Sequence, residues 1–193
     1  MGLARFSKQA WIVAVAAAAI LASGAALFAA EAAASPGKLG FKAQNKVFKA
    51  DGEFKSWRFT KVDIPDGNIE KGTVEIEVDI ASVSTNADKL TEHLKQNDML
   101  DAAKFPKATI KIHSAKKTGE DSYEATADLT LRGVTKSIPV KFKTLGQSPL
   151  RIEGEAVVNR LDFGVYKPYD ASDERSVEPS VAILISAAVP EKI

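Results

Sequence analysis

Cysteine is absent from the 193-residue sequence. This absence excludes disulfide bonds, a thiolate nucleophile, cysteine-ligated zinc and a lipid-modified cysteine. Histidine is also scarce, since only His93 and His113 occur, and they are too far apart to match a local metal motif such as H-E-x-x-H. We expect His93 to lie on a helix surface or at a helix end, and His113 to be a solvated strand residue.

An excess of charge of one sign is missing too. The chain has 26 basic and 25 acidic residues and a formal charge of +1. It therefore lacks the strong basic field of a nucleic-acid-binding protein, and nucleic acid is not an expected partner. The same neutrality gives no long-range attraction to anionic lipid surfaces.

Recognisable catalytic motifs are lacking as well. No G-x-S-x-G, Walker or Rossmann pattern occurs, and the S-x-x-K match at residues 114–117 leaves a predicted strand instead of opening a helix. The acidic residues between Asp170 and Arg175 fit a solvated loop better than a calcium site. The sequence gives no positive argument for an enzyme, and we expect no catalytic residue, no metal and no cofactor.

The first 34 residues have a different composition from the rest. Arg5 and Lys8 precede an apolar stretch over residues 10–28, and small residues follow up to Ala34. This is the arrangement of a secretory signal peptide, so we predict a signal helix in residues 1–34, its cleavage, and a periplasmic location. The alternative is an uncleaved membrane anchor, because the apolar stretch is almost long enough to span a bilayer.

Period-two alternation of apolar and polar residues dominates the remaining chain and predicts strands with one apolar face. The strand sets are Val74, Ile76, Val78 and Ile80; Ala108, Ile110 and Ile112; Tyr123, Ala125, Ala127, Leu129 and Leu131; Ile138, Val140 and Phe142; Leu150, Ile152, Ala156 and Val158; and Val181, Ile183, Ile185, Ala187 and Val189. Turns are expected at Asp51-Gly52, Asp66-Gly67, Thr118-Gly119, Arg132-Gly133 and Gly146. Residues 86–95 have helical spacing, with Asn86 or Asp88 as N-cap.

About eight short strands joined by turns predict an all-β fold, an antiparallel barrel with a short helical insertion. No linker divides the chain, so residues 37–193 are expected to form one domain. Several inward positions are small: Ala50, Ala108, Ala125, Ala127, Gly154, Ala156 and Ala187. Small residues leave room for a ligand or for larger neighbours, and the pattern leaves both open.

Four motifs occur in one order along the chain. They are Ser82–Thr85, the H-L…D…F-P segment from His93 to Pro106, the sequence LTLRGVTK at 129–136, and the R-x-D-F-G motif at 160–164. Together they resemble the YceI-like family of exported lipid-binding proteins. The resemblance implies a lipocalin-like barrel that holds a polyisoprenoid or fatty-acid-type chain. The sequence departs from the family at Asn45-Lys46, where a histidine is common, and at Ile110, where phenylalanine is common.

We therefore expect an exported protein that binds an isoprenoid, quinone-like or fatty-acid-like lipid inside its barrel for transport, storage or sequestration. The alternative is a filled barrel that serves as an interaction module for another envelope or respiratory protein. No stable membrane insertion is expected after signal cleavage, and a homodimer is left open. The residues expected to line the barrel are Phe48, Phe54, Trp57, Phe59, Val74, Ile76, Val78, Ile110, Ile112, Leu129, Leu131, Ile138, Val140, Phe142, Phe163, Ile183 and Ile185.

Overall fold

The computed structural model describes residues 35–191 and 193. The predicted signal segment, residues 1–34, lies outside the described residues. Among those that are described, no helix has the length and apolar character needed to cross a bilayer.

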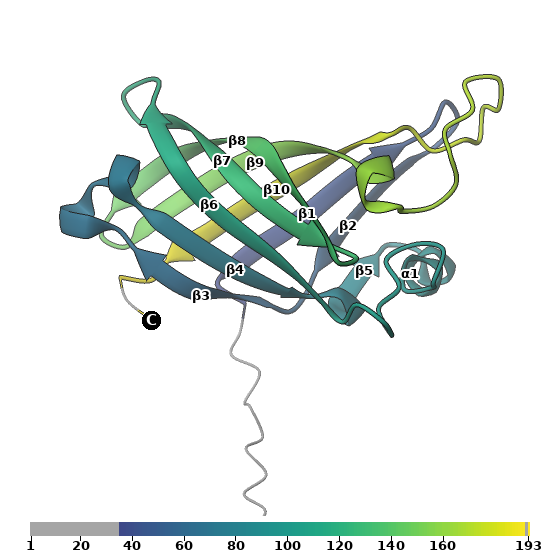
Figure 1. The fold of residues 1–193 in the computed structure, drawn as a ribbon, viewed down its shortest axis with the longest axis horizontal. Helices are drawn as coiled ribbons and strands as arrows, with labels where there is room; N and C mark the ends of the chain where they lie inside the picture. The colour runs from purple at the N-terminus through teal and green to yellow at the C-terminus, as the bar shows by residue number, and fades with distance from the viewer. Residues whose placement is uncertain (1–34, 192) are drawn as a thin grey trace, which may run out of the picture. The chain divides into compact units, whose positions relative to one another are not determined.

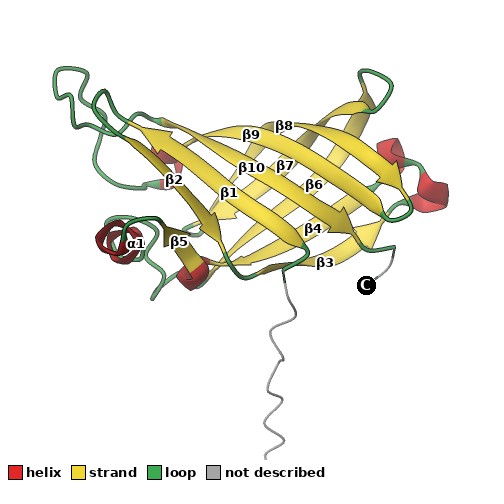
Figure 2. Cartoon of the chain, turned by 180° about the vertical axis from the view of Figure 1, so that it is seen from behind, coloured by secondary structure: helices red, strands yellow, loops and turns green. Residues whose placement is uncertain are grey.

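The domain is all-β and consists of one antiparallel sheet of ten strands that curls into an open barrel (Figures 1 and 2). The sheet order is β3-β4-β6-β7-β8-β9-β10-β1-β2-β5. The strands are β1 (Gly37–Gln44), β2 (Lys49–Phe54), β3 (Trp57–Asp63), β4 (Thr73–Asp79), β5 (Val83–Thr85), β6 (Lys107–Lys117), β7 (Ser122–Leu131), β8 (Val134–Gln147), β9 (Leu150–Asn159) and β10 (Ser180–Val189). The helices are α1 (Asp88–Leu94) and four 3₁₀ turns, η1 (Pro65–Gly67), η2 (Ile69–Lys71), η3 (Ile80–Ser82) and η4 (Arg160–Phe163).

The sheet has ten strands instead of the eight expected, and β1, β2, β3 and β5 correspond to none of the six alternating sets. Asp51-Gly52, predicted as a turn, lies inside β2, where Gly52 is opposite Phe41 of β1. A Cβ at Gly52 would come within 2.3 Å of the Phe41 ring, so glycine is needed here for ring packing and not for a turn. The three-residue β5 was too short to show any alternation.

The two ends of the sheet meet at the connection between β2 and β3. Lys55 N donates to Ser82 O at 3.1 Å, and Asp79 N donates to Ser56 O at 3.0 Å. No ladder joins β3 to β2 or β5 anywhere in residues 35–191. The barrel is therefore closed by a few bonds at this connection and open along the rest of the seam.

Inward-facing residues form rows around the barrel because the register places them opposite one another. In one row Ile112 of β6 is opposite Ala127 of β7, which in turn is opposite Ile138 of β8. Ala127 is fully buried between these two larger side chains. In this row a small residue lies between two large ones, a common way of filling a small barrel.

The β7–β8 hairpin has the two-residue turn expected at Arg132-Gly133. Both residues have positive φ, 51° and 76°, which is the combination that a type I′ hairpin turn requires. Further along β8, Pro139 is opposite Thr126 of β7, but the β8–β9 ladder begins only at Val140. Pro139 therefore lies where one side of β8 loses its partner, as expected for a residue without an N–H.

Helix α1 occupies the predicted helical segment but has a different N-cap. Ala87 is the cap residue and has no side-chain hydrogen bond. Asn86 or Asp88 was expected to cap the helix, but Thr85 does so instead. Thr85 Oγ1 accepts a hydrogen bond from Ala87 N at 3.2 Å and lies 2.9 Å from Thr91 Oγ1. Figures 1 and 2 show α1 at the same end of the barrel as η4 and the loop that follows it.

Candidate functional site

The interior of the barrel contains an apolar cavity of about 200 Å³. Its wall is formed by inward side chains of the strands together with residues of the α1 and η4 segments. Residues of the turns at the opposite end, between β3 and β4, β6 and β7, and β8 and β9, are absent from its wall. The cavity therefore lies toward the α1 end of the barrel.

Five of the seven isoleucines on this wall are only partly buried although they point inward. The five that pack against the core without being covered by it are Ile110, Ile112, Ile138, Ile183 and Ile185. The other two, Ile76 and Ile80, are each 1% exposed although they line the same cavity. The five partly buried isoleucines lie beside the cavity, so this part of the barrel is not filled by side chains.

Small residues form part of the cavity wall. Ala108, Ala127, Gly154 and Ala156 all lie in the cavity wall. A Cβ at Gly154 would be 3.0 Å from Phe142 Cβ, so that a larger residue there would push on the wall. The sequence left open whether the small inward residues accommodate neighbours or a ligand. Ala127 and Gly154 are closely packed by neighbouring side chains, and all four residues border the cavity.

Most of the residues expected to line the barrel are in the cavity wall. They are Phe54, Ile76, Val78, Ile110, Ile112, Leu129, Leu131, Ile138, Val140, Ile183 and Ile185. Whether they contact a ligand stays a prediction.

The other six do not line the cavity. Trp57, Phe59 and Phe163 are buried in the packed core, and Val74 packs against it. Phe142 stacks on Tyr123 with ring centroids 5.2 Å apart. Phe48 is 53% exposed because residues 45–48 form the tip of the β1–β2 hairpin, closed by Asn45 N donating to Phe48 O at 2.9 Å.

The α1 end of the cavity is formed by residues that sequence reasoning missed. Leu94, Met99 and Leu100 come from α1 and the segment after it, and Val165 and Tyr166 follow η4. These segments have no strand periodicity, so no pattern marked the residues as lining. The only sequence signal for these residues was their position in or next to two of the four family-like motifs, the H-L…D…F-P segment and the R-x-D-F-G motif.

The motif at the β7–β8 turn holds the α1 segment in place. Arg132 Nη1 donates to the carbonyl oxygens of Asn97, at 2.9 Å, and of Met99. The Arg132 guanidinium also lies 5.9 Å from the centroid of the Phe105 ring, which packs close to Gly133. The LTLRGVTK sequence is thus a structural support for this end of the cavity.

The α1 segment is also joined to the residues after η4. Tyr166 N donates to Asp98 O at 2.7 Å. His93 Nε2 is 3.2 Å from Asp98 Oδ2, and the His93 ring packs edge-on against the Tyr166 ring at 5.8 Å. His93 lies near a helix end, as expected, and connects the two segments.

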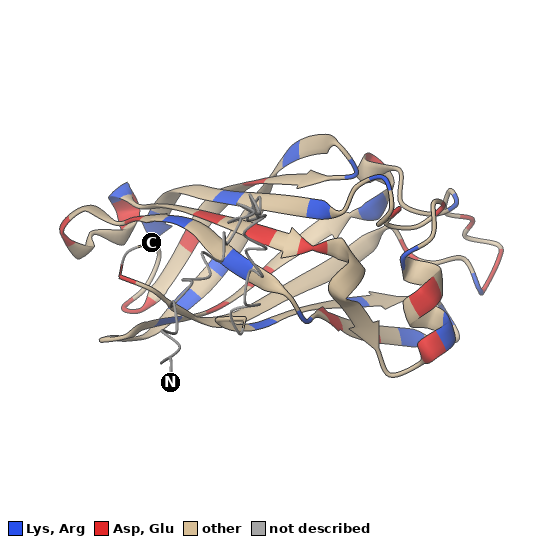
Figure 3. Cartoon of the chain, turned by 90° about the horizontal axis from the view of Figure 1, so that it is seen from below, with Lys and Arg blue, Asp and Glu red and all other residues tan. Residues whose placement is uncertain are grey.

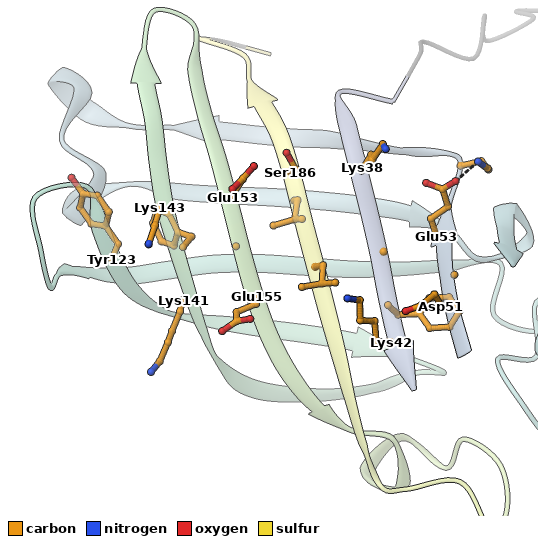
Figure 4. Close-up of a pocket in the computed structure, with 18 of the residues that line it drawn as sticks. Lys38, Lys42, Asp51, Glu53, Tyr123, Lys141, Lys143, Glu153, Glu155 and Ser186 are labelled. Atoms are coloured by element: carbon orange, nitrogen blue, oxygen red, sulfur yellow. Dashed lines mark hydrogen bonds and ion pairs between the residues drawn. The ribbon is translucent and has the colours of Figure 1, made fainter. Parts of the chain in front are cut away.

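A second, larger hollow lies on the outer face of the sheet. It measures about 1300 Å³ and is lined by residues of strands β5, β2, β1, β10, β9, β8 and β7. Basic and acidic residues are interspersed over the strands of the domain (Figure 3). In this hollow Lys141 and Lys143 of β8 are opposite Glu155 and Glu153 of β9 (Figure 4). This open, mixed-charge surface offers no apolar enclosure, so only the smaller inner cavity is suited to an apolar chain.

His113 is part of a hydrogen-bonded chain on the outside of the barrel and is not simply solvated. Its Nδ1 is 2.9 Å from Ser114 Oγ, and its Nε2 is 3.2 Å from Asp128 Oδ2. Ser137 Oγ donates to the other carboxylate oxygen of Asp128 at 2.5 Å, and this bond, followed by His113, holds the pKa of Asp128 below its usual range. None of the four residues lines either hollow.

The loop considered for calcium is arranged by its own turns. Asp170 Oδ1 accepts from Ser172 N at 2.9 Å, and Asp173 Oδ1 accepts from Arg175 N at 2.9 Å. The described residues contain no group of three His, Cys, Asp or Glu side chains placed to hold a metal ion.

Comparison with known proteins matches residues 31–189 to the YceI-like domain. A UPF0312 protein of Pseudomonas savastanoi pv. phaseolicola is 33% identical over 136 residues, covering 67% of this chain and 70% of the relative. Protein YceI of Escherichia coli is 35% identical over 99 residues, covering 48% of this chain and 51% of the relative.

Two solved structures share the fold. BcnA of Burkholderia cenocepacia has a TM-score of 0.70 at 19% identity, over 79% of this chain and 96% of BcnA. A polyisoprenoid binding domain from Saccharophagus degradans has a TM-score of 0.57 at 18% identity, over 81% of this chain and 97% of that domain. The domain match extends over every strand of the sheet and confirms the resemblance seen in the four motifs. The chain belongs to the YceI-like domain family.

Proposed function

We propose that this protein binds the hydrocarbon chain of an isoprenoid or similar long-chain amphiphile inside its barrel, and that it does so in the periplasm after export, for transport, storage or sequestration. The observation that carries the proposal is the unfilled apolar cavity beside half-buried isoleucines. The polyisoprenoid-binding description of one structural neighbour gives it further support.

The energy of such binding would come from burial of the chain. Each buried methylene contributes about 0.8 kcal/mol, so about ten of them offer about 8 kcal/mol before the entropy of association is subtracted. The cavity of about 200 Å³ is smaller than the roughly 300–1000 Å³ of typical small-molecule sites. A long chain therefore needs flexible lining residues such as Met99 to change rotamer.

The alternative, a filled barrel that binds another envelope protein, requires a packed interior and an outer docking surface. The outer hollow is large enough for such a role. Its charged lining, however, is unlike the apolar centre of a stable protein interface, and the interior is not filled. The lipid proposal therefore accounts better for the unfilled interior.

Native mass spectrometry of the protein purified from its own host, followed by extraction and identification of the bound molecule, tests the proposal. We expect a mass increase that corresponds to a long-chain lipid and disappears after delipidation. A protein that is always ligand-free and also fails to take up long-chain prenols or fatty acids would contradict the proposal.

A further inference from the structure

The tip of the β1–β2 hairpin, residues 45–48, presents two adjacent apolar side chains to solvent. Val47 is 62% exposed and Phe48 is 53% exposed, and the lysines on either side of the pair, Lys46 and Lys49, are exposed as well. Hairpin turns favour Asn, Gly and Asp, so turn geometry does not account for a valine followed by a phenylalanine. Adjacent exposed apolar side chains of this kind are typical of an interaction surface.

The tip is held in place by the loop between η4 and β10. Lys46 N donates to Glu174 O at 3.2 Å, and Lys46 Nζ donates to Ala171 O at 2.7 Å. Asn45 Nδ2 donates to Arg175 O at 3.1 Å. Because the backbone of the tip is bonded to a second segment, the exposure of its apolar side chains is fixed by the fold.

The loop is in turn fixed to the barrel by Arg160, which is 5% exposed. Its Nη1 donates to Val165 O at 2.7 Å and to Lys167 O at 2.8 Å, and its Nε donates to Glu178 O at 3.0 Å. Glu178 N donates to Gln44 O, next to the tip, at 2.8 Å. The tip and the loop therefore form one projection, which extends beyond the strands at the α1 end of the barrel (Figures 1 and 2).

This projection lies beside the inner cavity. Ala43, two residues before the tip, and Val177 of the loop both line that cavity. Tyr169 of the loop is 37% exposed and adds a third large side chain to the exposed surface. Of the seven large hydrophobic residues that are exposed in the described part of the chain, three thus belong to the projection.

The charges of the projection nearly cancel, but they are unevenly placed. Residues 42–49 and 167–178 together contain five basic and four acidic residues. All four acidic residues belong to the loop, and the hairpin segment carries only lysines, Lys42, Lys46 and Lys49. The two apolar side chains of the tip are therefore flanked by positive charge on both sides.

A lipid bilayer fits this surface better than another protein does. A stable protein interface buries about 800 Å² on each partner, far more than Val47 and Phe48 can present. A bilayer accepts a small projecting tip, because apolar side chains enter the boundary between head groups and acyl chains while flanking lysines extend toward the phosphates.

We propose that the β1–β2 tip docks reversibly on a lipid bilayer, with Val47 and Phe48 in the head-group boundary. This inference goes beyond the proposed function, because it assigns the surface through which the protein meets a membrane. Docking also brings the α1 end of the inner cavity to the bilayer. Contact through so few apolar side chains is weak, so the protein can leave the membrane again.

Co-sedimentation with phosphatidylcholine vesicles, using the protein purified from its own host, measures the docking. Burial of roughly half a phenylalanine side chain corresponds to about a ten-fold change in partition, so Phe48→Ser should weaken vesicle binding about ten-fold. Leu145→Ser is the matched control, since Leu145 is 51% exposed near the β8–β9 turn at the opposite end, and it should bind like the native protein. Added phosphatidylglycerol should strengthen native binding only about five-fold, the effect of one net positive charge near an anionic surface.

Spin labels locate the contact. Because the sequence has no cysteine, Val47→Cys and Leu145→Cys each take a single nitroxide. On vesicles, the nitroxide in Val47→Cys should become accessible to oxygen and protected from a water-soluble nickel complex, whereas the nitroxide in Leu145→Cys should stay in water.

Three results would overturn the proposal: no vesicle binding by the native protein, equal binding by native protein and Phe48→Ser, or a nitroxide in Val47→Cys that stays in water. The first of these would leave the tip to a protein partner. The affinity for farnesol in solution should be unchanged in Phe48→Ser, because Phe48 does not line the cavity. Vesicle binding by a protein that takes up no lipid would refute the proposed function alone.

Discussion

Replacement of Ile110 by tryptophan tests whether the inner cavity is the binding site. Ile110 lies on β6 between Ile76 and Leu129, lines the cavity and is only partly buried, so a larger side chain there enters free space. The indole carries about six more non-hydrogen atoms than the isoleucine side chain and should displace roughly three methylenes of a bound chain, worth about 2.4 kcal/mol. We therefore expect Ile110→Trp to weaken the binding of farnesol about sixty-fold.

The stability of this variant should change little, because the added atoms fill existing space. We expect the free energy of unfolding to shift by less than about 1 kcal/mol, below the usual cost of overpacking a filled core. Thr109→Trp is the matched control, since Thr109 is the neighbouring residue on the same strand and faces outward. Calorimetric titration of farnesol should give the native affinity for this control. Native affinity in Ile110→Trp, or an equal loss in both variants, would refute the reasoning.

Three further predictions concern the wall and its supports. Gly133→Ala should lower the free energy of unfolding by about 1–2 kcal/mol, measured by urea denaturation, because the residue has a φ of 76° and its Cβ would be 3.2 Å from Phe105 Cε1. Pro139→Thr restores an N–H where β8 loses its partner, and should slow ligand release in stopped-flow experiments while Tm changes little. Asp128→Asn should make stability less dependent on pH below about 4: the Ser137 bond lowers the pKa of this carboxylate in the folded state, so the stabilisation is present above the unfolded pKa and is lost as the pH falls through the folded pKa.

Each of these predictions has a clear contrary result. Gly119→Ala changes a glycine without positive φ and should have little effect, so equal destabilisation by Gly119→Ala and Gly133→Ala would contradict the turn argument. If Pro139→Thr alters Tm as much as release, the residue has no special part in ligand exchange. If the free energy of unfolding of Asp128→Asn depended on acid pH in the same way as that of the native protein, the hydrogen bonds of Asp128 would not stabilise the fold.

The strand walls could be predicted from the sequence because side chains of a strand alternate with a period of exactly two residues. Ile110, Ile112, Leu129 and Leu131 were assigned inward by that alternation alone, and all four line the cavity. The turn at Arg132-Gly133 was equally accessible, since positive φ at two successive residues strongly favours glycine in such a turn.

The other features depend on contacts between distant segments. Gly52 has the local signature of a turn, but the Phe41 ring on the neighbouring strand determines its place in β2. Phe48 has the chemistry of a lining residue and is nevertheless exposed, because the β1–β2 hairpin turns at that point. The carbonyls around Arg160 come from a loop whose conformation no spacing indicates, so the R-x-D-F-G motif could be noticed in the sequence but its role could not be derived.

The central claim is that an apolar chain occupies the inside of the barrel. The most direct test is a crystal structure of the delipidated protein soaked with a long-chain alcohol that carries bromine at its methyl end, located by anomalous scattering. The account predicts a bromine peak within the cavity bounded by Ile110, Ala127 and Ile185. A bromine peak in the outer hollow beside Lys141 and Glu155, or an empty cavity at saturating ligand, would contradict it.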